Sequence, residues 1–117
     1  MSHEGMIHVR KAEDLEALWR EPRAVLNNHS PLCGLTASAA RQISAFGADH
    51  DHVPVYIVDV IRSRSLSRDV ERRLEVRHES PQAFVLRRGE VAWHASHSAI
   101  TRDALADAIA AAPGDSG

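Results

Sequence analysis

The sequence predicts an α/β fold in which a four-stranded mixed sheet is flanked by helices. Segments with apolar residues at helical spacing alternate along the chain with short runs of β-branched and aliphatic residues. Strands that are separated by helices normally run parallel, whereas the last two strands are joined by a short turn and therefore pair antiparallel. The expected order of elements is α-β-α-β-α-β-β-α.

The first half of the chain supplies two helices and two strands. Residues 12–19 place apolar side chains on one helical face and acids in the first turn, and residues 24–28 form a short strand. Residues 35–46 repeat the helical spacing, and Gly47 is expected to end this second helix. Residues 53–61 are nearly continuously apolar and β-branched, which is typical of a strand buried on both faces.

The second half begins with a strongly amphipathic segment. Apolar residues recur every fourth position within residues 65–75, which indicates a helix with its charged face outward. Residues 83–86 and 91–95 flank a short polar turn and predict a hairpin. Thr101 is expected to cap the final helix.

Length and composition indicate one domain over residues 1–112, with residues 113–117 expected to be a disordered tail. A net charge of −2 gives no electrostatic reason to expect a nucleic-acid partner. No run approaches the roughly 20 apolar residues that span a bilayer, and the start of the chain lacks a signal-peptide pattern. We therefore expect a cytoplasmic protein without a membrane partner, and a lone cysteine fits that reducing compartment.

The only cysteine, Cys33, lies between a predicted strand and a predicted helix. The start of a helix offers unpaired backbone N–H groups and the positive end of the helix dipole, and both favour the thiolate. Either Cys33 is the N-cap, or Ser30 is the cap with Pro31 at the first helical position. Both arrangements leave the sulfur in the first turn and predict an activated thiol. The alternative is that Cys33 is a small buried apolar residue.

The predicted order is that of a thioredoxin-like fold with one additional N-terminal helix. That fold places a reactive cysteine at the start of the helix after its first core strand, where Cys33 stands. It places a cis-proline before its third core strand, where Ser80-Pro81 stands. We interpret the Ser80 backbone as lying antiparallel to a bound peptide or thiol, with Pro81 beside the sulfur. A tight turn into an edge strand is the alternative interpretation.

Five further motifs stand out along the chain: Tyr56–Ile61, Arg64–Ser67, His78–Gln82, Val91–His97 and Ile100-Thr101. Together they resemble the bacilliredoxin-like (YtxJ-type) family of monothiol thioredoxin-fold proteins. The resemblance extends from the first helix through Ile109. After its cysteine this family typically carries Pro-Ile-Ser, whereas this chain has Gly34-Leu35-Thr36.

Residues around the cysteine are candidates for the substrate site. Gly34 either lets a substrate backbone approach closely or supplies flexibility alone, and the backbone N–H groups of Leu35 and Thr36 are available to the sulfur. Thr36 stands where dithiol relatives of the fold carry a resolving cysteine, and it is equally consistent with an ordinary first-turn threonine. His29 lies four residues before Cys33. It either modulates the thiolate electrostatically or is an exposed loop histidine.

The resemblance implies a monothiol thiol–disulfide oxidoreductase. Cys33 would attack a mixed disulfide between an S-thiolated protein and a low-molecular-weight thiol, expected to be bacillithiol. The small thiol would move onto Cys33, and a second thiol or an external thiol reductase would regenerate it, because the chain has no resolving cysteine. No bound cofactor is expected.

Two other functions remain open from the sequence. Cys33-Gly34-Leu35-Thr36 is similar to the Cys-Gly-Phe-Ser motif of monothiol glutaredoxins, which share an iron–sulfur cluster across a dimer. The other alternative is a thioredoxin-fold interaction protein with an inert thiol. The eight histidines do not follow the spacing of a structural zinc site, so we expect solvated histidines and no metal.

Overall fold

A five-stranded mixed sheet forms the centre of the molecule, with strand order β1-β3-β2-β4-β5. The computed structural model describes residues 6–30, 34–77 and 81–111, and for residues 34–36 it describes the backbone only. β1, β2 and β3 run parallel to one another, whereas β4 is antiparallel to both β2 and β5. The strands are β1 (Ile7–His8), β2 (Ala24–His29), β3 (Val55–Asp59), β4 (Gln82–Arg87) and β5 (Glu90–Ser96).

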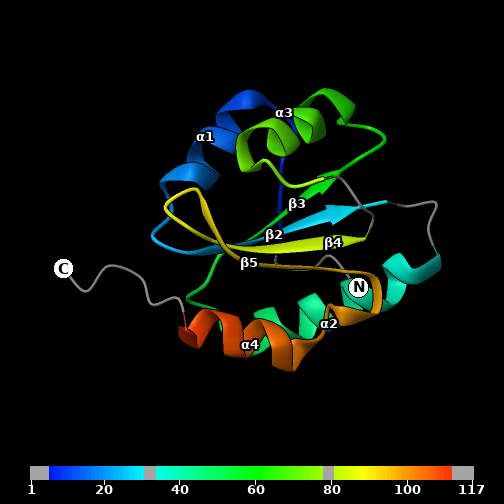
Figure 1. Cartoon of the computed structure of the whole chain (residues 1–117), viewed down its shortest axis with the longest axis vertical. Coiled ribbons are helices and arrows are strands. Elements are labelled where there is room, and N and C mark those ends of the chain that lie inside the picture. Colours follow the sequence, from blue (N-terminus) through cyan, green and yellow to red (C-terminus); the bar gives the residue numbers. More distant parts are fainter. Residues whose placement is uncertain (1–5, 31–33, 78–80, 112–117) are drawn as a thin grey trace.

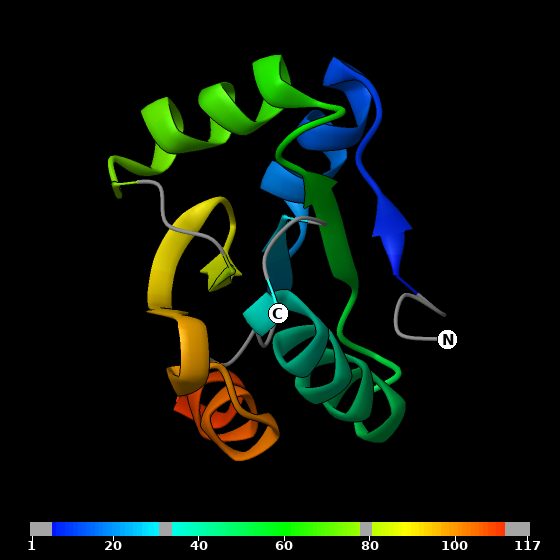
Figure 2. The same ribbon diagram turned by 90° about the vertical axis from the view of Figure 1, so that its right-hand side faces the viewer.

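Helices cover both faces of this sheet, two on each side (Figure 1). α1 (Ala12–Arg20) and α3 (Arg64–Leu74) lie on one face. α2 (Gly34–Asp49) and α4 (Arg102–Ala111) lie on the other, as Figure 2 shows from the side. A short 3₁₀ turn, η1 (His97–Ala99), joins β5 to α4. Within the described residues, no helix is long and apolar enough to cross a membrane.

The central strands separate two apolar clusters, because successive side chains of a strand point to opposite faces. In β2, Val25 packs with α2 and α4, whereas Leu26 packs with α1 and α3. In β3, every residue from Val55 to Val58 is buried. The prediction of a strand buried on both faces is thus confirmed, together with the α/β class and its mixed sheet.

Two details of the prediction were wrong. The sheet has a fifth strand, β1, which is two residues long and pairs with Tyr56 and Ile57 of β3. A strand this short has no visible periodicity, so only its pairing reveals it. The second helix does not end at Gly47 but continues to Asp49. The Gly47 backbone continues the helix, and a Cβ at this position would lie 3.7 Å from Val55 Cγ2, so the tendency of glycine to terminate helices is not realised here.

The connections of β2 and β3 leave the sheet in opposite directions. β2 leads into α2 on one face, whereas its parallel neighbour β3 leads into α3 on the other (Figure 1). In open α/β sheets, ligands bind outside the carboxyl ends of strands at such a divergence. Antiparallel β4 brings its amino end to the same edge. We call this the divergent edge: the carboxyl ends of β2 and β3 with the amino end of β4.

The structure confirms the predicted N-cap of the last helix, and its contribution to stability can be measured. Thr101 Oγ1 accepts the Ala104 backbone N–H at 3.1 Å, as an N-cap should. Thr101→Ala is expected to lower the free energy of unfolding by about 1 kcal/mol in urea denaturation. The exposed Ser98→Ala is the matched control and should change it by less than about 0.5 kcal/mol. Equal losses in the two variants would contradict the capping role.

Candidate functional site

The divergent edge brings together residues that are far apart in the sequence. His29 ends β2 and is in register with Asp59, the last residue of β3. The His29 carbonyl accepts the Val60 N–H at 2.9 Å, which holds the two strand ends together. Asn28 is in register with Gln82, so Pro81 precedes β4 at this same edge. α2 begins beside it, as Figure 1 shows.

The predicted nucleophile Cys33 and the predicted substrate residue Ser80 lie outside the described residues. Their described neighbours along the chain are Gly34, which opens α2, and Pro81, which leads into β4. Both neighbours belong to the divergent edge. The backbone of Leu35 and of Thr36 is helical, whereas their side chains are not described.

The amino end of α2 is an electropositive environment. Its first turn contains no acidic residue, so no carboxylate on the helix offsets the positive end of the dipole. The 16-residue length of α2 gives it a fully developed dipole. This end of the helix would stabilise an anionic group bound next to it.

Pro81 is held from the side of β5. It is buried, and its carbonyl accepts the His97 backbone N–H at 3.0 Å. His97 adopts a left-handed backbone with φ of 56°, which turns the chain immediately after β5 and aims this N–H at Pro81. We predicted a solvated role for His97 from the sequence, and its side chain is indeed exposed. Its backbone, however, positions a candidate substrate-site residue.

A buried polar network joins β2 to the chain segment before β4. Asn28 Nδ2 donates to Gln82 Oε1 at 3.2 Å, and Gln82 Nε2 donates to the Arg77 carbonyl at 3.0 Å. Asn28 is 2% exposed and Gln82 is 1% exposed, so the pair is shielded from water. The network fixes the strand that leads to Cys33 relative to the one that follows Pro81. The sequence analysis did not identify Asn28 as part of a buried polar network. Two consecutive asparagines within an otherwise apolar strand are the pattern that could have indicated it.

Asn27 is the neighbouring polar residue and faces the opposite side of the sheet, towards the layer of α2 and α4. Its side chain is 1% exposed. Neither its amide nitrogen nor its amide oxygen has a hydrogen-bond partner among the described residues. A buried amide without a partner costs free energy. Asn27 is such a group within the described part of the chain, and it lies near the divergent edge.

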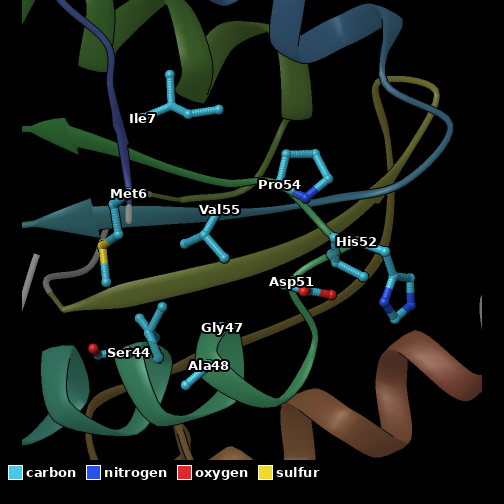
Figure 3. Close-up of a pocket in the computed structure, with 11 residues that line it drawn as sticks. Met6, Ile7, Ser44, Gly47, Ala48, Asp51, His52, Pro54 and Val55 are labelled. Carbon is cyan, nitrogen blue, oxygen red and sulfur yellow. The ribbon is translucent and has the colours of Figure 1, made fainter. Parts of the chain in front are cut away.

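His29, the predicted thiolate modulator, is partly buried and lines a cavity of about 380 Å³ at the divergent edge. A larger cavity of about 610 Å³ lies elsewhere, between the second half of α2 and the start of β3. Figure 3 shows Met6 and Val55 pointing toward α2 across this larger cavity, with Asp51 and His52 on the loop after the helix. It lies at the far end of α2 from Gly34.

Solved structures of thioredoxins share this architecture. Mitochondrial thioredoxin 3 from Saccharomyces cerevisiae is 13% identical with a TM-score of 0.74, and the match covers 95% of this chain and 99% of that one. Thioredoxin from Fasciola hepatica is 18% identical with a TM-score of 0.74, covering 92% and 100%. At these identities the likeness establishes a thioredoxin fold alone, as the sequence predicted.

Sequence similarity then identifies the family. The family model described as monothiol bacilliredoxin BrxC matches residues 7–105, and this chain belongs to that family. A thioredoxin-fold protein described as a proposed oxidoreductase is 29% identical with a TM-score of 0.84, and the match covers 92% of this chain and 96% of that one. Family and fold together support a thiol redox role for this protein.

The adjacent asparagines of β2 provide a matched test of the buried polar groups. Asn27→Leu replaces an amide that has no partner among the described residues by an apolar group of similar size, so the free energy of unfolding should rise by about 1 kcal/mol or more. Asn28→Leu removes the donor to Gln82 and should lower it by about 1 kcal/mol. Urea denaturation of both variants measures the two values. A loss of stability in Asn27→Leu would show that this amide is satisfied.

Proposed function

We propose that this protein is a monothiol thiol–disulfide oxidoreductase that reduces mixed disulfides between proteins and a low-molecular-weight thiol, with bacillithiol as the expected thiol. The observation that carries the proposal is the amino end of α2. It has no acidic residue in its first turn, lies at the divergent edge with buried Pro81, and directly follows the only cysteine of the chain. Membership of the monothiol bacilliredoxin family supports the same chemistry.

The proposed reaction has two exchange steps. The Cys33 thiolate attacks the small-thiol sulfur of the mixed disulfide; a new S–S bond forms, the old one breaks, and the protein sulfur leaves as a thiolate that takes a proton from water. Cys33 then carries the small thiol. A second thiolate, from another small thiol or from a thiol reductase, attacks this adduct and releases Cys33 as the thiolate. The chain has no second cysteine, so this second step needs an outside partner.

The residues next to Cys33 would orient the substrate. Backbone N–H groups at Leu35 and Thr36 would stabilise the attacking sulfur, and Gly34 would leave room for the incoming disulfide. The Ser80 backbone would pair with the bound substrate, while Pro81 would pack beside the sulfurs.

The proposed partners are S-thiolated proteins and a reductant of the thiol class. Thiol exchange needs no bound cofactor, because the electrons move within the sulfur bonds that are exchanged. A reducing cytoplasm is the compartment that this chemistry suits, and there a lone cysteine stays reduced.

Replacing the sulfur tests the proposal directly. Cys33→Ser is expected to abolish release of bacillithiol from a bacillithiolated protein, because a serine hydroxyl is not ionised at neutral pH. The assay follows the thiolated protein by intact-mass spectrometry with excess reductant. Ser98→Ala is the control and should retain the wild-type rate. An unchanged rate in Cys33→Ser would exclude the proposed role.

The ionisation of the thiol separates an active cysteine from an inert one. The rate of alkylation of Cys33 by iodoacetamide, measured against pH, should give an apparent pKa below the unperturbed value of about 8.5. The physical cause is the positive end of α2. A moderate decrease is expected, since an exchange thiol works best with a pKa near ambient pH. An apparent pKa at or above about 8.5 would favour the inert interaction protein.

A further inference from the structure

The larger cavity, between the second half of α2 and the start of β3, has the composition of a small-molecule site. Its volume is about 610 Å³, within the size range of ligand pockets. Its buried apolar lining residues are Met6, Ile43, Val53 and Val55. Asp51 and His52 lie at the opposite end of the cavity from Met6, as Figure 3 shows. An apolar chamber with a few polar groups at one end suits an amphipathic ligand.

Gly47 leaves a gap in the wall that α2 contributes to this cavity. Its backbone is helical and its φ is not positive, so the conformation does not require glycine. Outside the helix itself, the one described atom within 4 Å of an added Cβ would be Val55 Cγ2, at the ordinary contact distance of 3.7 Å. Sterics therefore do not require glycine either. Glycine destabilises a helix relative to alanine, and what this position gains in return is open space facing Val55.

The polar end of the cavity is held in place by the turn after α2. The Val53 N–H donates to the His50 carbonyl at 2.9 Å. Asp51 and His52 are therefore the central residues of a tight turn. The His50 ring stacks on Phe46 with centroids 4.3 Å apart, and its Nδ1 donates to the Phe46 carbonyl at 3.0 Å. These contacts anchor the turn to α2, so the fold sets the position of Asp51 relative to the apolar lining.

The cavity lining is negatively charged when His52 is neutral. Asp51 is its one carboxylate, and no arginine or lysine is among the described residues that line it. Within the described part of the chain, the Asp51 carboxylate takes part in no ion pair or side-chain hydrogen bond. Asp49, two residues earlier, is by contrast paired with Arg102 Nε at 2.8 Å. An ammonium group complements such a carboxylate, because it carries the opposite charge and three hydrogen-bond donors.

We propose that this cavity binds a small apolar amine. The apolar body of the ligand lies against the buried side chains, in the space beside Gly47, and its ammonium group lies beside Asp51. Two independent features define this ligand class: the space that the missing side chain leaves, and the sign of the charge at the turn. The proposal does not involve Cys33, so its outcome is separate from that of the proposed function.

Three indole compounds of similar size and different charge test the ligand class. They are tryptamine, which is cationic, tryptophol, which is neutral, and indole-3-acetate, which is anionic. Each is titrated into the reduced wild-type protein at neutral pH and followed in ¹H–¹⁵N spectra. Tryptamine should shift the backbone amide signals of Gly47, Ala48 and Val53 saturably. It should bind roughly fivefold more tightly than tryptophol, the scale of one exposed ion pair, and added salt should reduce this difference.

Asp51→Asn tests the charge at the turn. This variant should lower the affinity for tryptamine to that for tryptophol and leave the tryptophol affinity unchanged. Asp107→Asn removes the same charge from an exposed position of α4 outside the cavity lining and is the matched control. The proposal is overturned if the two variants have the same effect on tryptamine binding. It is also overturned if the wild type binds indole-3-acetate as tightly as tryptamine.

Gly47→Leu tests the space in the wall. A leucine side chain at this position projects toward Val55 and occupies the cavity, so the affinities for tryptamine and tryptophol should both fall about tenfold or more. Ala37→Leu adds a leucine side chain to an exposed position of the same helix outside the cavity lining, and it should change neither affinity. Unchanged tryptamine binding in Gly47→Leu would contradict the proposal.

Gly47→Ala provides a second test that does not depend on the folding of the leucine variant. The added Cβ makes only an ordinary contact with Val55, so this variant should fold. Its midpoint of urea denaturation should rise, because alanine stabilises a helix relative to glycine. Its affinity for tryptamine should lie between those of the wild type and Gly47→Leu. A lower midpoint would show that the fold itself needs glycine here, and the proposal would lose its support from the open space and fall.

Discussion

The pairing of β2 with two different neighbours is the constraint on which the rest of the structure depends. β2 is parallel to β3 on one side and antiparallel to β4 on the other. This arrangement brings two carboxyl ends and one amino end to the same edge, and the opposite crossovers to α2 and α3 open a crevice there. This register places the start of α2 and buried Pro81 at the same edge.

Two buried asparagines of β2 have different hydrogen bonding near the divergent edge. The Asn28 amide nitrogen donates to Gln82 Oε1 across the β2–β4 pairing, which adds a directional link to an otherwise apolar sheet, while the Asn28 Oδ1 has no partner among the described residues. Asn27, on the other face, carries an amide without partners among the described residues. Real proteins tolerate such departures from consistent packing chiefly near functional sites. The location of Asn27, six residues before Cys33, agrees with that expectation.

Sequence patterns determined the class of fold, the position of most elements and the single thiol, because periodicity, capping and residue counts are local properties. Thr101 illustrates this: its hydroxyl and its place before an apolar pattern were sufficient to predict a cap. The motifs from Tyr56 to Thr101 likewise carried the family. Only the tertiary structure revealed β1, the extension of α2 past Gly47, the roles of Asn27 and Asn28, and the meeting of Met6, Gly47 and Asp51 in one cavity. All of these features arise because residues that are distant in the chain pair in the sheet or bury one another. No local sequence pattern encodes such contacts.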